Sequence, residues 1–211
     1  MASQLILPTA YLPPVQWFTR LLRGRQCIVE ACESYAKQTY RNRCVIDSPQ
    51  GALALTVPVE SSASRLVRDI RVSEHGAWRH RHWQALVSSY AGSPFFEYYA
   101  DDFRPLYERR YDYLLDLNEA LTAVCLDLLN LEVALPRTEQ YASLAPEEDL
   151  RRLISPKVPL ANDSSFAPVP YYQVFGAKRK AFLPNLSIVD LLFNMGPESI
   201  IILHQSTLNT L

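Results

Sequence analysis

Short apolar runs separated by turn residues dominate the first part of the chain. Residues 5–7 predict a buried strand, and Pro13-Pro14 opens a helical pattern over residues 15–22, because proline is favoured at a helix start. Further strands are predicted over residues 27–31, 43–47, 52–59 and 67–72. The turn composition of residues 48–51 predicts that the strands on either side of it form a hairpin.

After these strands the pattern becomes mainly helical. Apolar side chains at spacings of three and four predict a helix over residues 76–90 and a long amphipathic helix from about residue 104 to 130. The alternation over residues 131–135 predicts one more strand. Residues 188–193 predict a short helix that ends at residues 194–197.

Residues 136–170 are polar, partly acidic and contain several prolines. We interpret them as an excursion or lid with one short helix near residues 147–154. With strands early and helices in the middle, we expect an α/β fold, a mixed β-sheet flanked by helices, in a single domain over residues 1–211. A segregated α+β arrangement is the alternative.

Composition narrows the class of protein. The chain has 211 residues, 48% hydrophobic and 20% charged, which is enough to build a core. A net charge of −1 gives no reason to expect nucleic acid as a partner. The start lacks a signal-peptide pattern and no apolar run is long enough for a membrane helix, so we expect a cytoplasmic protein without membrane insertion. The sequence is compatible with a homo-oligomer and with a monomer.

The cysteines and the absence of common motifs restrict the chemistry. The four cysteines have no paired spacing, and we expect buried free thiols in preference to a disulfide or a zinc site: Cys27, Cys32, Cys44 and Cys125. There is no glycine-rich phosphate loop, no GxSxG, no HExxH and no zinc pattern. We therefore predict no metal and no cofactor.

The segment from Lys37 to Arg43 concentrates polar groups between two apolar runs. Lys37, Arg41 and Arg43 stand with Asn42 in seven residues, and arginines with amides suit recognition of carboxylates, phosphates and sugar hydroxyls. The segment therefore predicts a site for a small anionic or sugar-like ligand. The alternative is that these cations decorate a turn that faces solvent.

A second cluster lies in the predicted helix over residues 76–90. His82 lies one turn after Trp78, whereas His80 projects elsewhere, so the two histidines cannot chelate one metal. His82 is a candidate general base because its unperturbed pKa lies near neutrality. The alternative is a hydrogen-bonded histidine packed against Trp78.

Two more segments supply candidate binding groups. Asn185 or Ser187 can cap the last predicted helix, whose first turn can present N–H groups to an anion. Asp190 falls inside that apolar helix and needs a cation or a donor, for which Arg41 or Arg43 are reasonable partners. Residues 9–14 form a strand-to-helix turn, where we expect Tyr11 to be exposed and near a ligand.

These four segments, in this order, resemble the WbqC-like family of bacteria. The resemblance is closest at residues 35–42, 78–96 and 182–196, and the run from Pro184 to Asn194 is its most specific part. Residues that match the family are Tyr11, Pro13, Lys37, Arg41, Asn42, Trp78, His82, Asn185, Asp190 and Asn194. The chain departs from the family in lacking the opening Gln-Pro, the Gly after it and the Gly-rich segment of longer members.

Family members occur among genes for O-antigen and other surface polysaccharides. The resemblance implies transfer of a small group, glycine or another aminoacyl or acyl group, onto a sugar or nucleotide-linked sugar. His82 and Asp190 would then be catalytic. The substrate would be bound by Tyr11, Lys37, Arg41, Asn42, Arg43, Trp78, Asn185 and Asn194. The alternative is a non-catalytic ligand-binding or assembly protein that uses the same pocket or the tyrosine-rich residues 90–113.

Overall fold

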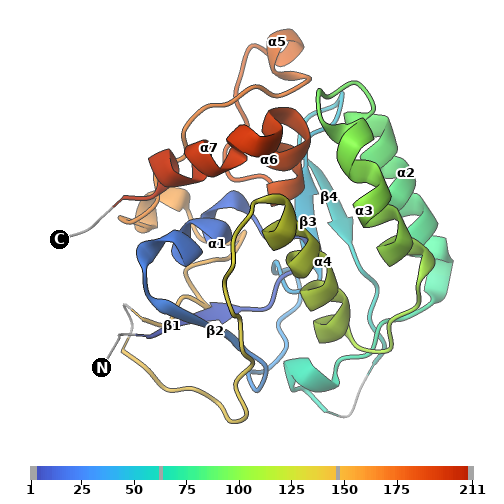
Figure 1. The fold of residues 1–211 in the computed structure, drawn as a ribbon. Helices are drawn as coiled ribbons and strands as arrows, with labels where there is room; N and C mark the ends of the chain where they lie inside the picture. Colours follow the sequence, from blue (N-terminus) through green and yellow to red (C-terminus); the bar gives the residue numbers. More distant parts are fainter. Residues whose placement is uncertain (1–3, 62–63, 146–147, 209–211) are drawn as a thin grey trace.

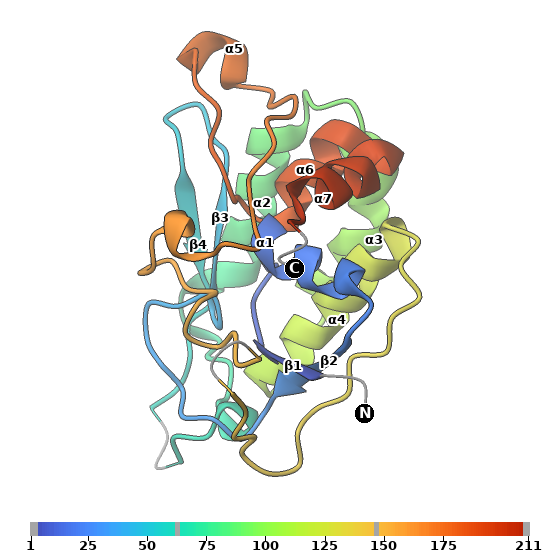
Figure 2. The same ribbon diagram turned by 90° about the vertical axis from the view of Figure 1, so that its left-hand side faces the viewer.

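A computed structural model describes residues 4–61, 64–145 and 148–208 (Figures 1 and 2). Its strands are β1 (Gln4–Pro8), β2 (Gln26–Glu30), β3 (Arg43–Ile46) and β4 (Leu53–Thr56). Its α-helices are α1 (Val15–Thr19), α2 (Trp78–Tyr90), α3 (Phe96–Glu108), α4 (Leu114–Leu128), α5 (Gly176–Arg179), α6 (Ile188–Met195) and α7 (Ser199–Ser206). Shorter 3-10 turns join them at η1 (Arg20–Arg23), η2 (Val67–Asp69), η3 (His75–Ala77), η4 (Leu160–Asn162) and η5 (Gly196–Glu198).

The strands form two separate pairs in the described part of the chain. β1 and β2 are parallel, with Leu5 opposite Cys27, and α1 with η1 connects them. β3 and β4 form the predicted antiparallel hairpin, with Arg43 opposite Thr56. The predicted α/β class is confirmed, and its strands are divided between two small sheets.

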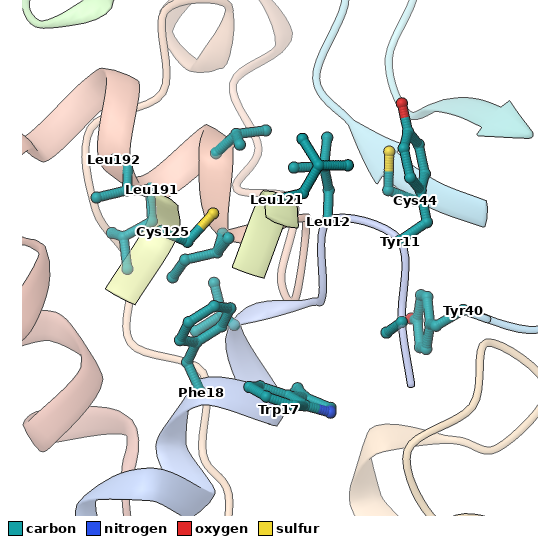
Figure 3. Packing of buried hydrophobic residues seen from close by; sticks show 14 of the residues in the cluster. Tyr11, Leu12, Trp17, Phe18, Tyr40, Cys44, Leu121, Cys125, Leu191 and Leu192 are labelled. Carbon is teal, nitrogen blue, oxygen red and sulfur yellow. The ribbon is translucent and has the colours of Figure 1, made fainter. Parts of the chain in front are cut away.

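Helix α6 lies at the centre of the core. Its sequence is almost wholly apolar, and its first seven residues are buried. Such a helix must be covered on every side, and α6 contacts α1, α2, α3, α4 and α7. Phe193 of α6 packs edge-on against Phe96 and Phe103 of α3. Figure 3 shows Leu191 of the same helix next to Cys125 of α4, and Leu121 of α4 next to Leu12.

The long helix predicted from about residue 104 to 130 is in fact two helices. α3 already begins at Phe96 and ends at Glu108, and α4 begins at Leu114. The backbone between them is extended because it pairs with the segment after η2. The Val72 N–H donates to the Asp112 carbonyl at 2.9 Å, and the Leu114 N–H donates to the Ile70 carbonyl at 2.9 Å.

Three other predictions of regular structure were wrong. The strand predicted over residues 67–72 begins as the 3-10 turn η2, and only its last two residues make isolated bridges. Residues 131–135 form no strand, and residues 148–154 form turns in place of a helix. Residues 146–147 lie outside the described residues. Helix α7 was not predicted.

The excursion over residues 136–170 is attached to the two parallel strands. The Val29 N–H donates to the Pro136 carbonyl, and the Ile6 N–H donates to the Glu148 carbonyl. Glu30 accepts hydrogen bonds from Thr138 and Arg151 at 2.6 and 2.9 Å. The excursion therefore adds long-range contacts to the edge of β1 and β2.

All four cysteines are free and buried, as predicted. Among the described helices, none combines the length and the apolar character that a membrane span requires.

Gly196 ends α6 in a conformation that other residues rarely adopt, with φ at +54°. A Cβ at this position would also overlap the Phe95 ring. We expect Gly196→Ala to lower the free energy of unfolding by about 1–3 kcal/mol, measured by urea denaturation. Gly92→Ala is the matched control, because a Cβ there finds only Val174 at 3.9 Å, and it should change stability little. Equal effects of the two substitutions would contradict this explanation.

Candidate functional site

A buried chain of hydroxyl and imidazole groups connects β1 to α2 and α3. Tyr11 follows β1, and its N–H donates to the Tyr40 carbonyl at 2.8 Å. The Tyr11 hydroxyl lies 2.8 Å from His82 Nδ1 and 2.8 Å from the Tyr107 hydroxyl. The expected exposure of Tyr11 is wrong, because its side chain is fully buried beside Cys44 and Tyr40 (Figure 3). The residues around the turn cover it completely.

His82 is held in its neutral form. Burial lowers the pKa of His82 to about 4, more than its hydrogen bond with the Thr56 backbone raises it. Because the Thr56 carbonyl can only accept, the second ring nitrogen carries the proton and Nδ1 accepts from Tyr11. Trp78 packs edge-on against His82, with ring centroids 5.1 Å apart. The imidazole can thus accept a proton only through Tyr11.

The residues of the Lys37–Arg43 segment point in different directions. Arg41 is buried, and its guanidinium donates two hydrogen bonds to Glu33. Asn42 Nδ2 donates to the Val57 carbonyl at 2.9 Å, and Arg43 Nε donates to Thr56 Oγ1 at 3.1 Å. Lys37 is exposed.

Lys37 contributes to a polar pocket of about 450 Å³. The pocket is lined by Tyr35, Lys37, Val59, Glu60, Ser61, Ser64, Arg65 and Ile70. Partial burial raises the pKa of the Tyr35 hydroxyl, and the positive charges of Arg41 and Arg43 oppose this rise.

Asp190 is held by neutral donors. It accepts hydrogen bonds from the hydroxyls of Tyr90 and Tyr171 at 2.8 and 2.6 Å, and from Gln173 Nε2 at 3.2 Å. Burial raises the pKa of Asp190 to about 6, although all three donors lower it. The expected arginine partners are therefore wrong, since Arg41 binds Glu33.

The remaining polar residues of the closing segment support the backbone. Asn185 Oδ1 accepts from the Gln16 N–H at 2.8 Å, and Asn194 Nδ2 donates to the Asp190 carbonyl at 2.7 Å. Ser187 caps α6, as one of the two predicted candidates. The first turn of α6 does not offer N–H groups to an anion, because the Ile188 N–H donates to the Pro13 carbonyl.

Only some of the predicted residues thus form a buried polar seam along α2, and no described pocket collects them all. Tyr11, Trp78 and His82 meet near the end of β4, and α2 carries the seam to Tyr90 and Asp190. Asn185 lies apart, against α1. Lys37 faces the polar pocket on its own.

Sequence reasoning missed residues that turn out to be structural partners. Glu33 pairs with Arg41, and Tyr107 continues the hydroxyl chain. Tyr107 belongs to the tyrosine-rich residues 90–113, which the sequence indicates as a possible interaction surface. Glu33 stands eight residues before Arg41, and its carboxylate could have been predicted as the partner of that arginine. In the described ranges no group of His, Cys, Asp and Glu side chains is arranged to hold a metal ion.

A family model, the WbqC-like protein family, matches residues 9–164. The chain belongs to this WbqC-like family. The match includes the Lys37–Arg43 segment and His82, and it ends before Asn185. An uncharacterized protein of Mycobacterium tuberculosis is 28% identical to this WbqC-like chain over 225 residues, which cover 94% of this chain and 96% of that protein. No solved structure matches the chain.

The raised pKa of Asp190 predicts a pH-dependent contribution to stability. An Asp with a folded pKa of about 6 favours protonation in the folded state, so its contribution is largest below the unfolded pKa of about 4 and disappears as the pH rises through 6. Asp190→Asn removes this titration. The difference in unfolding free energy, wild type minus variant, should increase by about 2 kcal/mol as the pH falls from about 7 to 4.

Chemical denaturation at a series of pH values measures this difference. Other titrating groups, His82 among them, are present in both proteins and cancel in the comparison. A difference that stays constant between pH 7 and 4 would show that the environment does not favour the protonated carboxyl.

Proposed function

We propose that this WbqC-like protein binds a small anionic, hydroxyl-bearing ligand of the sugar phosphate type in the polar pocket. The observation that supports this most is the placement of two cations, Lys37 and Arg65, with the ring of Tyr35 around one hollow. Lysine and arginine are suited to phosphate, and an aromatic ring suits the apolar face of a sugar.

The other groups of the pocket complement such a ligand. Glu60 and the serines at its rim can hydrogen bond to sugar hydroxyls, and Val59 and Ile70 supply an apolar surface. Arg41 has a supporting part in this proposal, because its guanidinium is occupied by Glu33 and stabilises the segment that carries Lys37.

Titration calorimetry with glucose 1-phosphate and with glucose tests this function. We expect the phosphate ester to bind more tightly, and Lys37→Gln or Arg65→Gln to weaken it about tenfold each, because a charge-assisted hydrogen bond is lost. Lys178→Gln is the control, because this exposed lysine lies on α5, away from the pocket. Binding that is equal for both ligands, or equally weakened by the control, would refute the proposal.

A second candidate function is transfer of a small aminoacyl or acyl group onto a sugar or nucleotide-linked sugar. It is favoured by the position of Tyr107, which lines a groove of about 340 Å³ between α2 and α3 and also hydrogen bonds to Tyr11. Trp83, Gln84 and Glu108 line the same groove, and an aromatic ring with polar neighbours suits a sugar.

In this function the acceptor hydroxyl loses its proton to the chain of hydroxyls that ends at His82 Nδ1. The acyl carbon–sulfur bond of the thioester donor breaks as the new ester bond forms, and the proton passes to the departing thiolate, which leaves as the thiol. The low pKa of His82 makes it a weak base. The series Tyr107, Tyr11 and His82 therefore passes the proton on to the leaving group and does not hold it on the imidazole.

Tyr107→Phe separates catalysis from structure, because it removes the hydroxyl and keeps the ring. With UDP-glucose and a glycyl thioester, we expect turnover to fall about 100-fold while the melting temperature changes by only a few degrees. Mass spectrometry of the acylated sugar measures turnover. His82→Asn should likewise abolish turnover and leave ligand binding nearly intact.

Tyr98→Phe is the control, since the Tyr98 side chain is 75% exposed. The transferase function fails if the wild-type protein makes no acylated sugar, or if the loss of turnover in the variants only follows their loss of stability. The ligand-binding function would be untouched by that result, because it rests on a different pocket.

A further inference from the structure

A pocket of about 250 Å³ lies between α4 and the extended residues 131–135, separate from the two sites above. Its floor includes Thr9 and Ala10, which directly follow β1. Figure 2 shows α4 next to β1 and β2. Open α/β folds usually bind ligands at the carboxyl ends of their parallel strands, so the position of this pocket favours a ligand site.

The wall of this pocket is mainly apolar. It includes Trp17, Val29, Leu126, Val133 and Leu135. Water gains few hydrogen bonds against such a surface, and an apolar group that replaces it is favoured. The pocket is larger than the cavities of roughly 150 Å³ that accept benzene in a protein core.

Asn118 supplies a polar group in the same wall. It is 1% exposed, and its Nδ2 donates to Thr9 Oγ1 at 3.0 Å and to the Arg41 carbonyl at 2.8 Å. Because a carbonyl can only accept, these contacts fix the orientation of the amide. Asn118 Oδ1 then has no hydrogen-bond partner among the described residues. A buried acceptor without a partner is costly, and a donor on a ligand would relieve that cost.

The charge at the rim is balanced. Glu119 lines the pocket, and its carboxylate is paired with the Arg137 guanidinium. No other charged side chain lines it in the described part of the chain. A charged ligand would therefore find no counter-ion, whereas a neutral one loses little on entering.

We propose that this pocket binds a small neutral molecule with an apolar body and a hydrogen-bond donor group, such as a primary amide or an alcohol. The donor bonds to Asn118 Oδ1, and the apolar body lies against Trp17 and Val29. This site goes beyond the proposed function, since it shares no lining residue with the polar pocket.

Two probes of similar shape test the proposal without altering the protein. Benzamide carries an N–H donor, and methyl benzoate does not. We expect benzamide to bind about threefold to tenfold more tightly, the range that one net hydrogen bond provides. In NMR titrations of the wild-type chain, the amide signals of Thr9, Val29 and Thr122 should shift with benzamide.

A matched pair of variants locates the site. Ala123 is exposed and lines the pocket, so Ala123→Leu should fill the mouth and weaken benzamide binding by more than about tenfold without disturbing the core. Ala134→Leu makes the same change at an exposed position outside the lining and should bind like wild type.

Three results would overturn the proposal: no shift with either probe, equal affinity for both, or unchanged binding in Ala123→Leu. None of them depends on glucose 1-phosphate, so failure here is distinguishable from failure of the proposed function.

Discussion

Buried carboxylates need hydrogen-bond donors, and this need organises the rest of the molecule. A buried charge without partners costs several kcal/mol, so the chain must bring donors to it. Five acidic residues are buried in the described ranges: Glu30, Glu33, Asp47, Asp163 and Asp190. Most of their donors lie far away in the sequence. Asp190, for example, receives the hydroxyl of Tyr90 from α2 and that of Tyr171 from the loop before α5.

This constraint matters more here than in a protein with a large sheet. Each sheet has only two strands, and between the end of α4 and the start of α6 the only described α-helix is the four-residue α5. Few backbone ladders are thus available to position that long stretch. Glu30 holds it through Arg151, Asp163 holds it through Arg20 of η1, and Asp47 holds α5 through Arg179. Side-chain ion pairs therefore reinforce the isolated backbone hydrogen bonds that attach this stretch to β1 and β2.

The same distinction explains what the sequence could predict. Periodicity located β1, β2, the hairpin, α2 and α6, because each buries one face or all of its surface within a short window. It failed at residues 109–113, whose extended backbone depends on pairing with residues 70–72, and no local pattern reports such pairing. It identified Asp190 as needing a partner but chose arginine, since the tyrosine donors come from separate segments. The sequence showed which residues need polar partners, but it did not show which distant segments supply them.

The Lys37–Arg43 segment keeps its importance for a reason other than the expected one. Arg41 does not face a ligand, because Glu33 occupies its guanidinium and Asn118 occupies its carbonyl. Asn118 lines the apolar pocket beside α4, and Lys37 of the same segment as Arg41 lines the polar pocket. A buried residue bonded at both ends cannot shift without breaking hydrogen bonds on both sides. The segment thus contributes Lys37 to one pocket and, through the Arg41 carbonyl, orients the Asn118 side chain in the wall of the other.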